Sequence, residues 1–318
     1  MAILDWREIR RAARIIGEGG LVAIPTETVY GLAADATNDK AVARIFEAKG
    51  RPRFNPLIIH VADEEAAAAH VDFSPLARRL AAEFWPGPLT LVLPRRASST
   101  VSLLASAGLD TIAVRAPASD IAQALLKTLR LPLAAPSANR SGALSPTRAD
   151  HVRESLGPVV DMILDGGPCP IGVESTIVKI DGDAALILRA GGVATSSIER
   201  ALGQRLAKAS AGATVEAPGM LSSHYAPKAR LRIGAACPRD DEAFLAFGGF
   251  ADLPHTLNLS PSGDLREAAA NLFAYLRTLD RICAEEGLEG IAVAPVPNEG
   301  IGEAINDRLR RAAGSGFA

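Results

Sequence analysis

Residues 38–61 read NDKAVARIFEAKGRPRFNPLIIHV, and this stretch predicts a helix, a rigid basic loop and a strand in succession. An asparagine–aspartate pair begins the helix, whose apolar residues recur at helical spacing until about Lys49. Pro52 and Pro56 exclude a helix through the basic segment that follows, so this segment must be a loop. The apolar residues Leu57–Val61 then predict a strand. A helix and a strand joined in this way are typical of an α/β fold.

Further short helices and strands lie on both sides of this stretch. We predict helices near residues 5–18, 75–85, 121–129 and 145–156, and strands at 21–24, 89–93, 111–114, 132–135, 162–164, 175–180 and 186–188. Strict β–α–β alternation is missing, so we expect residues 1–207 to form one α/β domain with helices around a twisted, mixed β-sheet.

The second half of the chain predicts a linker and a smaller domain. Residues 208–228 are rich in Ala, Ser, Gly and Pro, which is typical of a linker. Their last part contains His224 and Tyr225, which a pure spacer rarely needs, so we expect it to pack on the protein. In residues 229–318, strands and helices alternate, and this predicts a small three-layer α/β domain with a parallel, Rossmann-like sheet.

Composition excludes several classes of protein. The chain has 318 residues, 48% of them hydrophobic, and a formal net charge of −2, so any positively charged site must be local. Cys169, Cys237 and Cys283 form no C-x-x-C motif, and the five histidines have no H-E-x-x-H spacing. An early charge argues against a signal peptide, and no apolar run approaches the ~20 residues that span a membrane. We therefore expect a cytoplasmic protein without a membrane segment.

Polar residues that suit chemistry follow the predicted strands. The segment Pro25–Leu32 places two threonines, a carboxylate and a phenol at a strand end, where α/β sheets bind ligands. In the basic loop, Lys49, Arg51 and Arg53 suit a polyphosphate, and Asn55 could add a hydrogen bond. The alternatives are a structural turn for the first segment and a solvated charge run for the second.

The segment Pro136–Gly142 is a third candidate. Its small hydroxyls and amides, followed by Ser145 and Thr147, suit a phosphate or ribose, although these two residues could also cap the next helix. Arg115, at the end of a strand that begins at Thr111, could bind a substrate carboxylate or a structural acid. Cys169 has no activating base nearby in sequence, so we interpret it as structural.

These segments resemble the threonylcarbamoyl-AMP synthase family, the YrdC-like enzymes, in the long two-domain form. The resemblance rests on the K-x-R and S-x-N signature at Lys49/Arg51 and Ser137/Asn139, while the chain lacks both a Walker A motif and a G-x-S-x-G motif. It also includes residues 24–61, 136–147, 172–178 and 188–192 and the linker motif at 224–227.

The resemblance implies a fold, a reaction and a set of site residues. The implied fold is a YrdC-like domain with a C-terminal extra domain. The implied reaction joins L-threonine, bicarbonate and ATP into threonylcarbamoyl-AMP and pyrophosphate, with Mg²⁺ on the nucleotide and no metal ligands from the chain. A downstream threonylcarbamoyl transferase complex would use the product to modify tRNA, which the enzyme could also contact. The implied residues are Lys49 and Arg51 for catalysis; Thr28, His60, Arg115, Ala135 and Ser175 for threonine; and Arg51, Asn55, Thr111, Ser137, Asn139, Ser145, Arg189 and Tyr225 for ATP.

Catalysis of this kind depends on positioning and charge, because the anionic carbamate needs no nucleophilic side chain. We expect Tyr225 to close over the nucleotide and exclude water. We also expect Lys49 and Arg51 to be loop residues with little burial. Two alternatives stay open: an RNA-binding module on the same fold, and a carbamoyl transferase with a different substrate.

Overall fold

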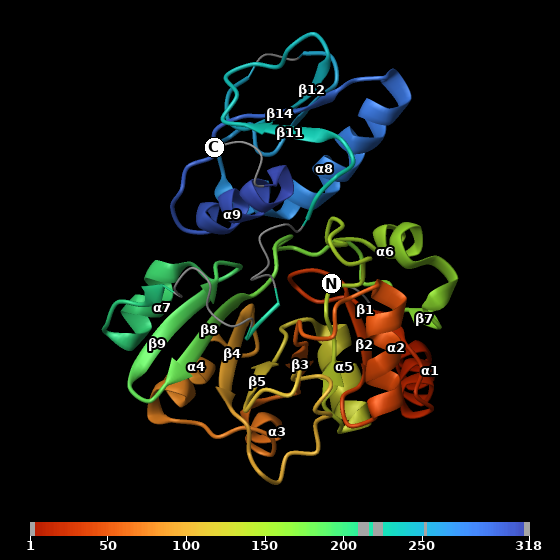
Figure 1. Cartoon of the computed structure of the whole chain (residues 1–318), viewed down its shortest axis with the longest axis vertical. Helices are drawn as coiled ribbons and strands as arrows, with labels where there is room; N and C mark the ends of the chain where they lie inside the picture. The colour runs from red at the N-terminus through yellow and green to blue at the C-terminus, as the bar shows by residue number, and fades with distance from the viewer. Residues whose placement is uncertain (1–3, 209–215, 219–224, 251–252, 315–318) are drawn as a thin grey trace.

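The computed structural model describes residues 4–208, 216–218, 225–250 and 253–314, whose helices and strands form two units (Figure 1). The N-terminal unit contains a sheet in the order β10-β9-β8-β4-β5-β3-β6-β2-β1-β7. Both parallel and antiparallel pairs occur within it, so the predicted mixed sheet is confirmed. Its strands are β1 (Val22–Ile24), β2 (Gly31–Asp35), β3 (Ile58–His60), β4 (Leu89–Pro94), β5 (Thr111–Arg115), β6 (Leu133–Ala134), β7 (Met162–Ile163), β8 (Thr176–Asp181), β9 (Ala184–Arg189) and β10 (Ala207–Lys208).

Helices pack on both faces of this sheet. α1 (Trp6–Gly17) and α5 (Asp120–Leu129) share one apolar cluster with alternate residues of β1, namely Val22 and Ile24. The larger cluster on the other face includes α2 (Asp39–Lys49), α4 (Pro75–Phe84), α6 (Ala149–Leu156) and α7 (Thr195–Leu202). Short α3 (Glu64–Ala68) and the 3₁₀ turn η1 (Gly157–Val159) complete the unit. Strands buried on both faces explain the nearly continuous apolar runs in the sequence.

Local capping explains where the decisive helix begins and ends. The side chain of Asn38 accepts hydrogen bonds from the backbone N–H groups of Lys40 and Ala41, and Gly50 ends α2 in the left-handed conformation. The possible cap of the later helix α6 by Ser145 or Thr147 is not found, because α6 begins at Ala149 and neither residue caps it. Strand β2 was missed altogether, since it follows directly on the polar turn after Pro25.

The C-terminal unit contains a second, fully parallel sheet in the order β11-β14-β12-β13. Its elements are β11 (Arg230–Ile233), β12 (Glu242–Ala246), β13 (Thr256–Asn258), α8 (Leu265–Glu286), β14 (Gly290–Val293) and α9 (Gly302–Ala313). Both helices lie on the face turned toward the N-terminal unit (Figure 1). On the other face Phe250 packs edge-on against the buried Phe244 at a ring distance of 5.2 Å, so loops cover that face.

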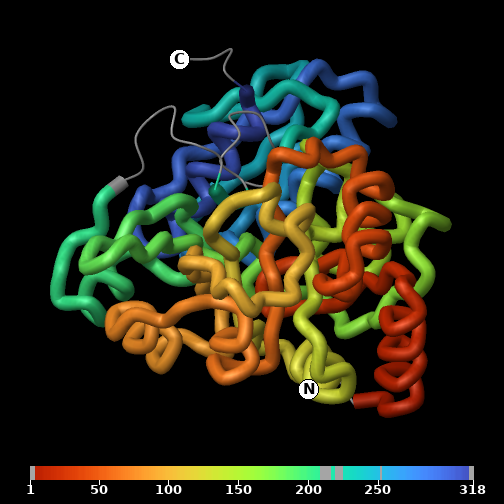
Figure 2. Tube along the Cα trace, turned by 60° about the horizontal axis from the view of Figure 1, so that its bottom comes forward, coloured from red at the N-terminus to blue at the C-terminus, as the bar shows by residue number. Residues whose placement is uncertain are grey.

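The two units share one apolar core. The cluster around α8 and α9 includes Val29, Leu144 and Val173, which come from three separate loops of the N-terminal unit, and the linker residue Tyr225. Figures 1 and 2 show from two directions that the C-terminal unit lies against the N-terminal one. These three loops are the segments in which the sequence predicted a site, so the contact holds them in place. None of the helices in the described ranges is long and apolar enough to cross a membrane.

Gly172 is the tightest point of this contact. Its φ of +79° favours glycine, and a Cβ placed there would lie 2.2 Å from the carbonyl oxygen of Ala269 on α8. We expect Gly172→Ala to lower the free energy of unfolding by at least ~2 kcal/mol, because backbone strain and a backbone clash combine. Urea unfolding measures this effect. Gly182→Ala is the control, since its φ is also positive but a Cβ there meets nothing within 4 Å; equal losses for the two variants would contradict the clash.

Candidate functional site

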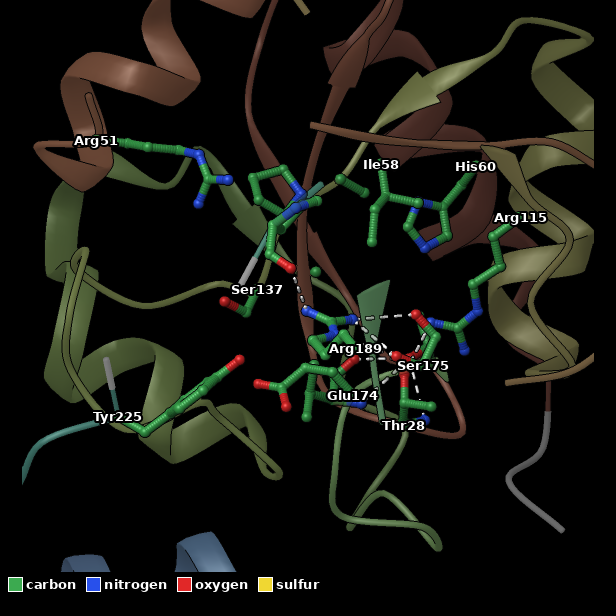
Figure 3. Close-up of a pocket in the computed structure, with 16 residues that line it drawn as sticks. Thr28, Arg51, Ile58, His60, Arg115, Ser137, Glu174, Ser175, Arg189 and Tyr225 are labelled. Carbon is green, nitrogen blue, oxygen red and sulfur yellow. Dashed lines mark hydrogen bonds between the residues drawn. The ribbon is translucent and has the colours of Figure 1, made fainter. Parts of the chain in front are cut away.

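The predicted segments surround one cavity at the contact between the two units (Figure 3). Turns after β1 and β6 and strands β3 and β5 form part of its wall, and β9 and the linker complete it. The lining residues are Thr26, Thr28, Val29, Gly31, Arg51, Ile58, His60, Arg115, Ala135, Pro136, Ser137, Glu174, Ser175, Arg189, Pro218 and Tyr225. Nine of the predicted site residues are therefore brought together: Thr28, Arg51, His60, Arg115, Ala135, Ser137, Ser175, Arg189 and Tyr225.

Arg51 enters the cavity from the turn that ends α2. Its Nε donates to the Asn55 carbonyl oxygen at 3.1 Å, and its Nη2 donates to Asn55 Oδ1 at 2.7 Å and to the Pro56 carbonyl oxygen at 2.9 Å. Its Nη1 makes no hydrogen bond within the described part of the chain. Burial lowers the pKa of Arg51 to about 10, so the guanidinium stays charged at neutral pH. The loop thus fixes one edge of a cation and leaves the other for a ligand.

Lys49 is buried, contrary to the expectation, and its role in catalysis stays a prediction. It is the last residue of α2 and only 2% exposed, and Arg51 is 7% exposed, so the expectation of little burial was wrong for both. Lys49 Nζ donates to the carbonyl oxygens of Ser137 and Asn139 at 2.6 and 2.5 Å. Burial and the neighbouring Arg51 lower its pKa well below the usual value. Lys49 does not line the cavity; it fixes the S-x-N segment, whose Ser137 does.

Arg115 pairs with a structural acid and still faces the cavity. Its Nη2 lies 2.6 Å from Glu27 Oε1, its Nη1 donates to Thr28 Oγ1 at 2.9 Å, and its Nε donates to the Gly87 carbonyl oxygen. The other oxygen of Glu27 accepts the backbone N–H of Ala118 at 3.0 Å. Because a guanidinium has five N–H groups, these bonds leave two for a ligand. The two sequence-based interpretations of Arg115 are therefore compatible.

His60 lies beside Arg115, since β3 and β5 pair these two residues in register. Its side chain is buried, and its Nδ1 has no hydrogen-bond partner within the described residues. Burial and the charge of Arg115 lower the pKa of His60 to about 3. At neutral pH the cavity therefore contains an uncharged imidazole with an unpaired nitrogen. A core histidine would normally be paired, so an unpaired nitrogen on a residue that lines the cavity is unusual.

The depressed pKa of His60 makes stability depend on pH. Between about pH 6.5 and 3 the unfolded chain binds a proton at this residue and the folded chain does not, so stability falls as the pH falls. At ~1.4 kcal/mol per pH unit, His60 should cost about 2 kcal/mol between pH 6.5 and 5. Urea unfolding at both pH values measures the loss. The variant His60→Gln should lose less stability over this interval; an identical loss would contradict the assignment.

Arg189 connects the wall of the cavity to the linker. Its Nη2 donates to the carbonyl oxygen and the hydroxyl of Ser175 at 2.9 and 3.2 Å, and its Nη1 donates to the Pro218 carbonyl oxygen at 3.2 Å. The Ser175 hydroxyl also lies 2.7 Å from Thr90 Oγ1. Burial lowers the pKa of Arg189. The strand ends of β8 and β9 and the linker are thus held together around one buried cation.

The other predicted residues do not line the cavity. Asn55 supports Arg51, and Asn139 donates through Nδ2 to the carbonyl oxygens of Arg140 and Ala143. Ser145 donates to the carboxylate of Glu174, and Thr111 is the first residue of β5. Direct contacts of these four residues with ATP stay predictions.

Cys169, interpreted from sequence as structural, is buried in the larger apolar cluster. Burial raises the pKa of its thiol to about 12, so the reactive thiolate is strongly disfavoured at neutral pH.

Sequence reasoning missed two residues at this site. Glu174 lies within a segment that we noted, but no role was assigned to it, and Arg308 of α9 was not considered. Arg308 pairs with Glu174 at 2.7 Å and is completely buried. One signal was available, because Arg308 lies on the apolar stripe of α9 with Ile305 and Ala312. A charge on such a stripe must find a buried partner.

The described residues contain no group of three or more His, Cys, Asp or Glu side chains able to hold a metal ion. Glu174 lines the cavity, but its Oε1 is bonded to Ser145 and its Oε2 to Arg308. The cavity wall therefore does not fit a metal held by the chain itself.

Fold and cavity together define an α/β protein with a cation-rich pocket between a mixed sheet and a smaller parallel-sheet unit. A family model for Sua5, YciO and YrdC proteins, described as "Telomere recombination", matches residues 14–191. A model described as "Threonylcarbamoyl-AMP synthase, C-terminal domain" matches residues 193–314. The chain belongs to the threonylcarbamoyl-AMP synthase family.

Individual relatives match over nearly their whole length. The threonylcarbamoyl-AMP synthase of Pyrococcus abyssi is 43% identical, over 98% of this chain and 95% of its own. That of Bacillus subtilis is 38% identical, over 96% of this chain and 93% of its own. A crystal structure of P. abyssi Sua5 complexed with L-threonine is similar with a TM-score of 0.89 and 41% identity, over 98% of this chain and 95% of that chain.

Proposed function

We propose that this protein is an L-threonylcarbamoyladenylate synthase, a nucleotidyltransferase that converts L-threonine, bicarbonate and ATP into threonylcarbamoyl-AMP and pyrophosphate. The observation that carries the proposal is the division of the cavity into two sides (Figure 3). Arg51, Ser137 and Tyr225 lie on one side, and His60 and Arg115 lie on the other. The family resemblance assigns the first group to ATP and the second to threonine.

The second side suits an amino acid. The two N–H groups that Arg115 retains can bind the carboxylate of threonine, and Glu27 holds the guanidinium in place. The hydroxyls of Thr28 and Ser175 and the unpaired nitrogen of His60 are neutral partners for the amine and hydroxyl. A site that hydrogen-bonds a substrate hydroxyl discriminates strongly against analogues that lack it.

The first side suits a nucleotide. Arg51 lines the cavity with its Nη1 unbonded within the described residues, and Ser137 is fixed by Lys49. Arg189 lies between the two sides in Figure 3, where both substrates can reach it. Cations prearranged in a buried site stabilise the charge of a phosphoryl transition state without reorganising.

The reaction needs no nucleophile from the chain. The amine of threonine and bicarbonate form a carbamate with release of water, and a carbamate oxygen attacks the α-phosphorus of ATP. The bond from the α-phosphorus to the bridging oxygen breaks, and pyrophosphate leaves with that oxygen. Positioning the two substrates in line and stabilising charge are then the main tasks of the site. Mg²⁺ would be held by the phosphates, since Glu174 is the one acidic side chain among the described lining residues and is already paired with Ser145 and Arg308.

The proposal includes a place in tRNA modification. The product is a mixed anhydride, so we expect a threonylcarbamoyl transferase complex in the cytoplasm to consume it on tRNA, with possible tRNA contact by this protein. We further propose that residues 1–207 form the catalytic domain, 208–228 the linker and lid, and 229–318 the C-terminal domain.

Pyrophosphate release with each substrate omitted in turn tests the function. We expect release only when ATP, L-threonine and bicarbonate are all present, and little release with L-2-aminobutyrate, which lacks the hydroxyl of threonine. Mass spectrometry of the product should show threonylcarbamoyl-AMP. Release that does not depend on threonine would refute the proposal. The proposal would also be refuted if the protein lacked this activity and bound RNA without competition from any of the three substrates.

A further inference from the structure

Arg308 brings a buried charge from the C-terminal unit to the wall of the cavity. Its Nε lies 2.7 Å from Glu174 Oε2, its Nη1 lies 2.5 Å from Asp307 Oδ2, and its Nη2 donates to the Ala190 carbonyl oxygen at 3.1 Å. Its side chain is completely buried. Burying an arginine costs free energy, so we expect these contacts to do more than fill space.

The guanidinium also lies over the ring of Tyr225. The distance from its carbon to the ring centroid is 5.1 Å, within the range of a cation–π contact. Phe273 of α8 packs against Tyr225 at a ring distance of 5.5 Å, and the backbone N–H of Ala226 donates to the Gly142 carbonyl oxygen. Arg308 and Phe273 both belong to the C-terminal unit, so this unit holds the tyrosine that lines the cavity.

The backbone of Tyr225 shows that its place is imposed by these contacts. Its φ is +66°, a left-handed conformation that costs a non-glycine residue of order 1 kcal/mol. The residue is nevertheless 1% exposed and packed inside the shared core. A strained residue stays in place only when its surroundings outweigh the strain, and Arg308 is the charged part of those surroundings.

Arg308 also balances the charge of Glu174 in the cavity wall. Burial alone would raise the pKa of Glu174, but Arg308 and Arg189 lower it to about 2, so the carboxylate is ionised. An uncompensated carboxylate in this wall would repel the phosphates of a nucleotide. Arg308 compensates it, and Glu174 in turn fixes the guanidinium against the ring of Tyr225.

We propose that Arg308 is a positioning residue of the nucleotide site, which holds the ring of Tyr225 against the cavity and neutralises Glu174 from behind. The C-terminal unit is then part of the ATP site. This inference rests on the proposed function for the identity of the nucleotide, but ATP affinity tests it without turnover. It also predicts that loss of Arg308 weakens the binding of ATP and leaves the binding of threonine, on the other side of the cavity, unchanged.

The test is a double-mutant cycle on ATP affinity with Arg308→Met and Tyr225→Ala in the full-length protein. Isothermal titration with a non-hydrolysable ATP analogue gives Kd without threonine, and steady-state assays give the KM values. We expect Arg308→Met to raise Kd and KM for ATP by about tenfold and to change the threonine KM by less than about twofold. In the Tyr225→Ala background, the same change should have little further effect.

Arg310→Met is the matched control, since Arg310 lies on the same helix and is exposed; it should leave both KM values unchanged. If Arg308→Met unfolds because Glu174 is left unpaired, the pair Glu174→Gln with Arg308→Met removes both charges and replaces it in the cycle. A purely structural ion pair predicts that this pair restores ATP affinity together with the melting temperature, and that result would overturn the proposal. Additive effects of Arg308 and Tyr225 would overturn it too.

Measurements of ATP binding and pyrophosphate release on the wild-type protein distinguish a failure of this inference from a failure of the proposed function. ATP binding without threonine-dependent pyrophosphate release would refute the function, and the cycle would then be judged on Kd alone. Failure to bind the ATP analogue at all would refute both.

Discussion

Replacing Arg51 with alanine should lower threonine-dependent pyrophosphate release by about a thousandfold, the effect of removing a prearranged donor at a developing charge. The structure fixes Nε and Nη2 of Arg51 on Asn55 and Pro56 and leaves Nη1 at the cavity. Arg51→Lys should keep the charge but lose most of the rate, because an ammonium group cannot make the supporting bonds and also present a donor to the ligand. Pyrophosphate release at saturating substrates measures both variants.

Because Arg51 is buried, its replacement should also affect the stability of the protein. Arg51 bonds three acceptors of its own loop, so Arg51→Ala should also lower the free energy of unfolding, by about 1–3 kcal/mol. The assay must therefore be run well below the melting temperature of the variant. Arg53→Ala is the control, because Arg53 is two residues away in the same loop and exposed. Near-normal rates in folded Arg51→Ala, or equal losses in both variants, would contradict the role assigned to Arg51.

Sequence alone predicted the features that depend on neighbours in the chain. The start of α2 at the asparagine–aspartate pair, its end at about Lys49 and the loop required by the prolines are local features, and each is found as predicted. The three polar segments were also located correctly, because ligand sites in α/β proteins follow strand ends. What a local signal cannot specify is the partner of a side chain.

The features that were missed all depend on contacts distant in sequence. Lys49 was expected at the surface, but its partners are carbonyl groups about ninety residues away. The charge of Arg308 is balanced by Glu174, 134 residues earlier. Strand β2 forms because β1 and β6 offer it edges on both sides, although four of its five residues are glycine, alanine or aspartate, which are weak strand formers. In each case the tertiary fold determines the contact partner, and a single sequence does not show which residues pair.

Ending the chain after Leu206 should lower threonine-dependent pyrophosphate release by a factor of a hundred or more. The truncation removes Tyr225 and Pro218 from the cavity wall and Arg308 from behind Glu174. Misplacing a substrate by ~1 Å already costs about a hundredfold. It also exposes Val29, Leu144 and Val173, which the C-terminal unit covers. We therefore expect lower stability and aggregation as well, and both are measurable by light scattering during heating.

Loss of stability alone could explain an inactive truncation, so the argument depends on Tyr225 in the full-length chain. Tyr225→Phe keeps the ring between Arg308 and Phe273 and should retain most of the activity. Tyr225→Ala removes the ring, leaves the C-terminal unit in place, and should weaken ATP binding with little change in threonine binding. If both variants and the truncation remain fully active, the lid is not needed. If Tyr225→Phe is as inactive as Tyr225→Ala, the hydroxyl rather than the ring contacts the nucleotide, and Arg308 positions that hydroxyl through the ring.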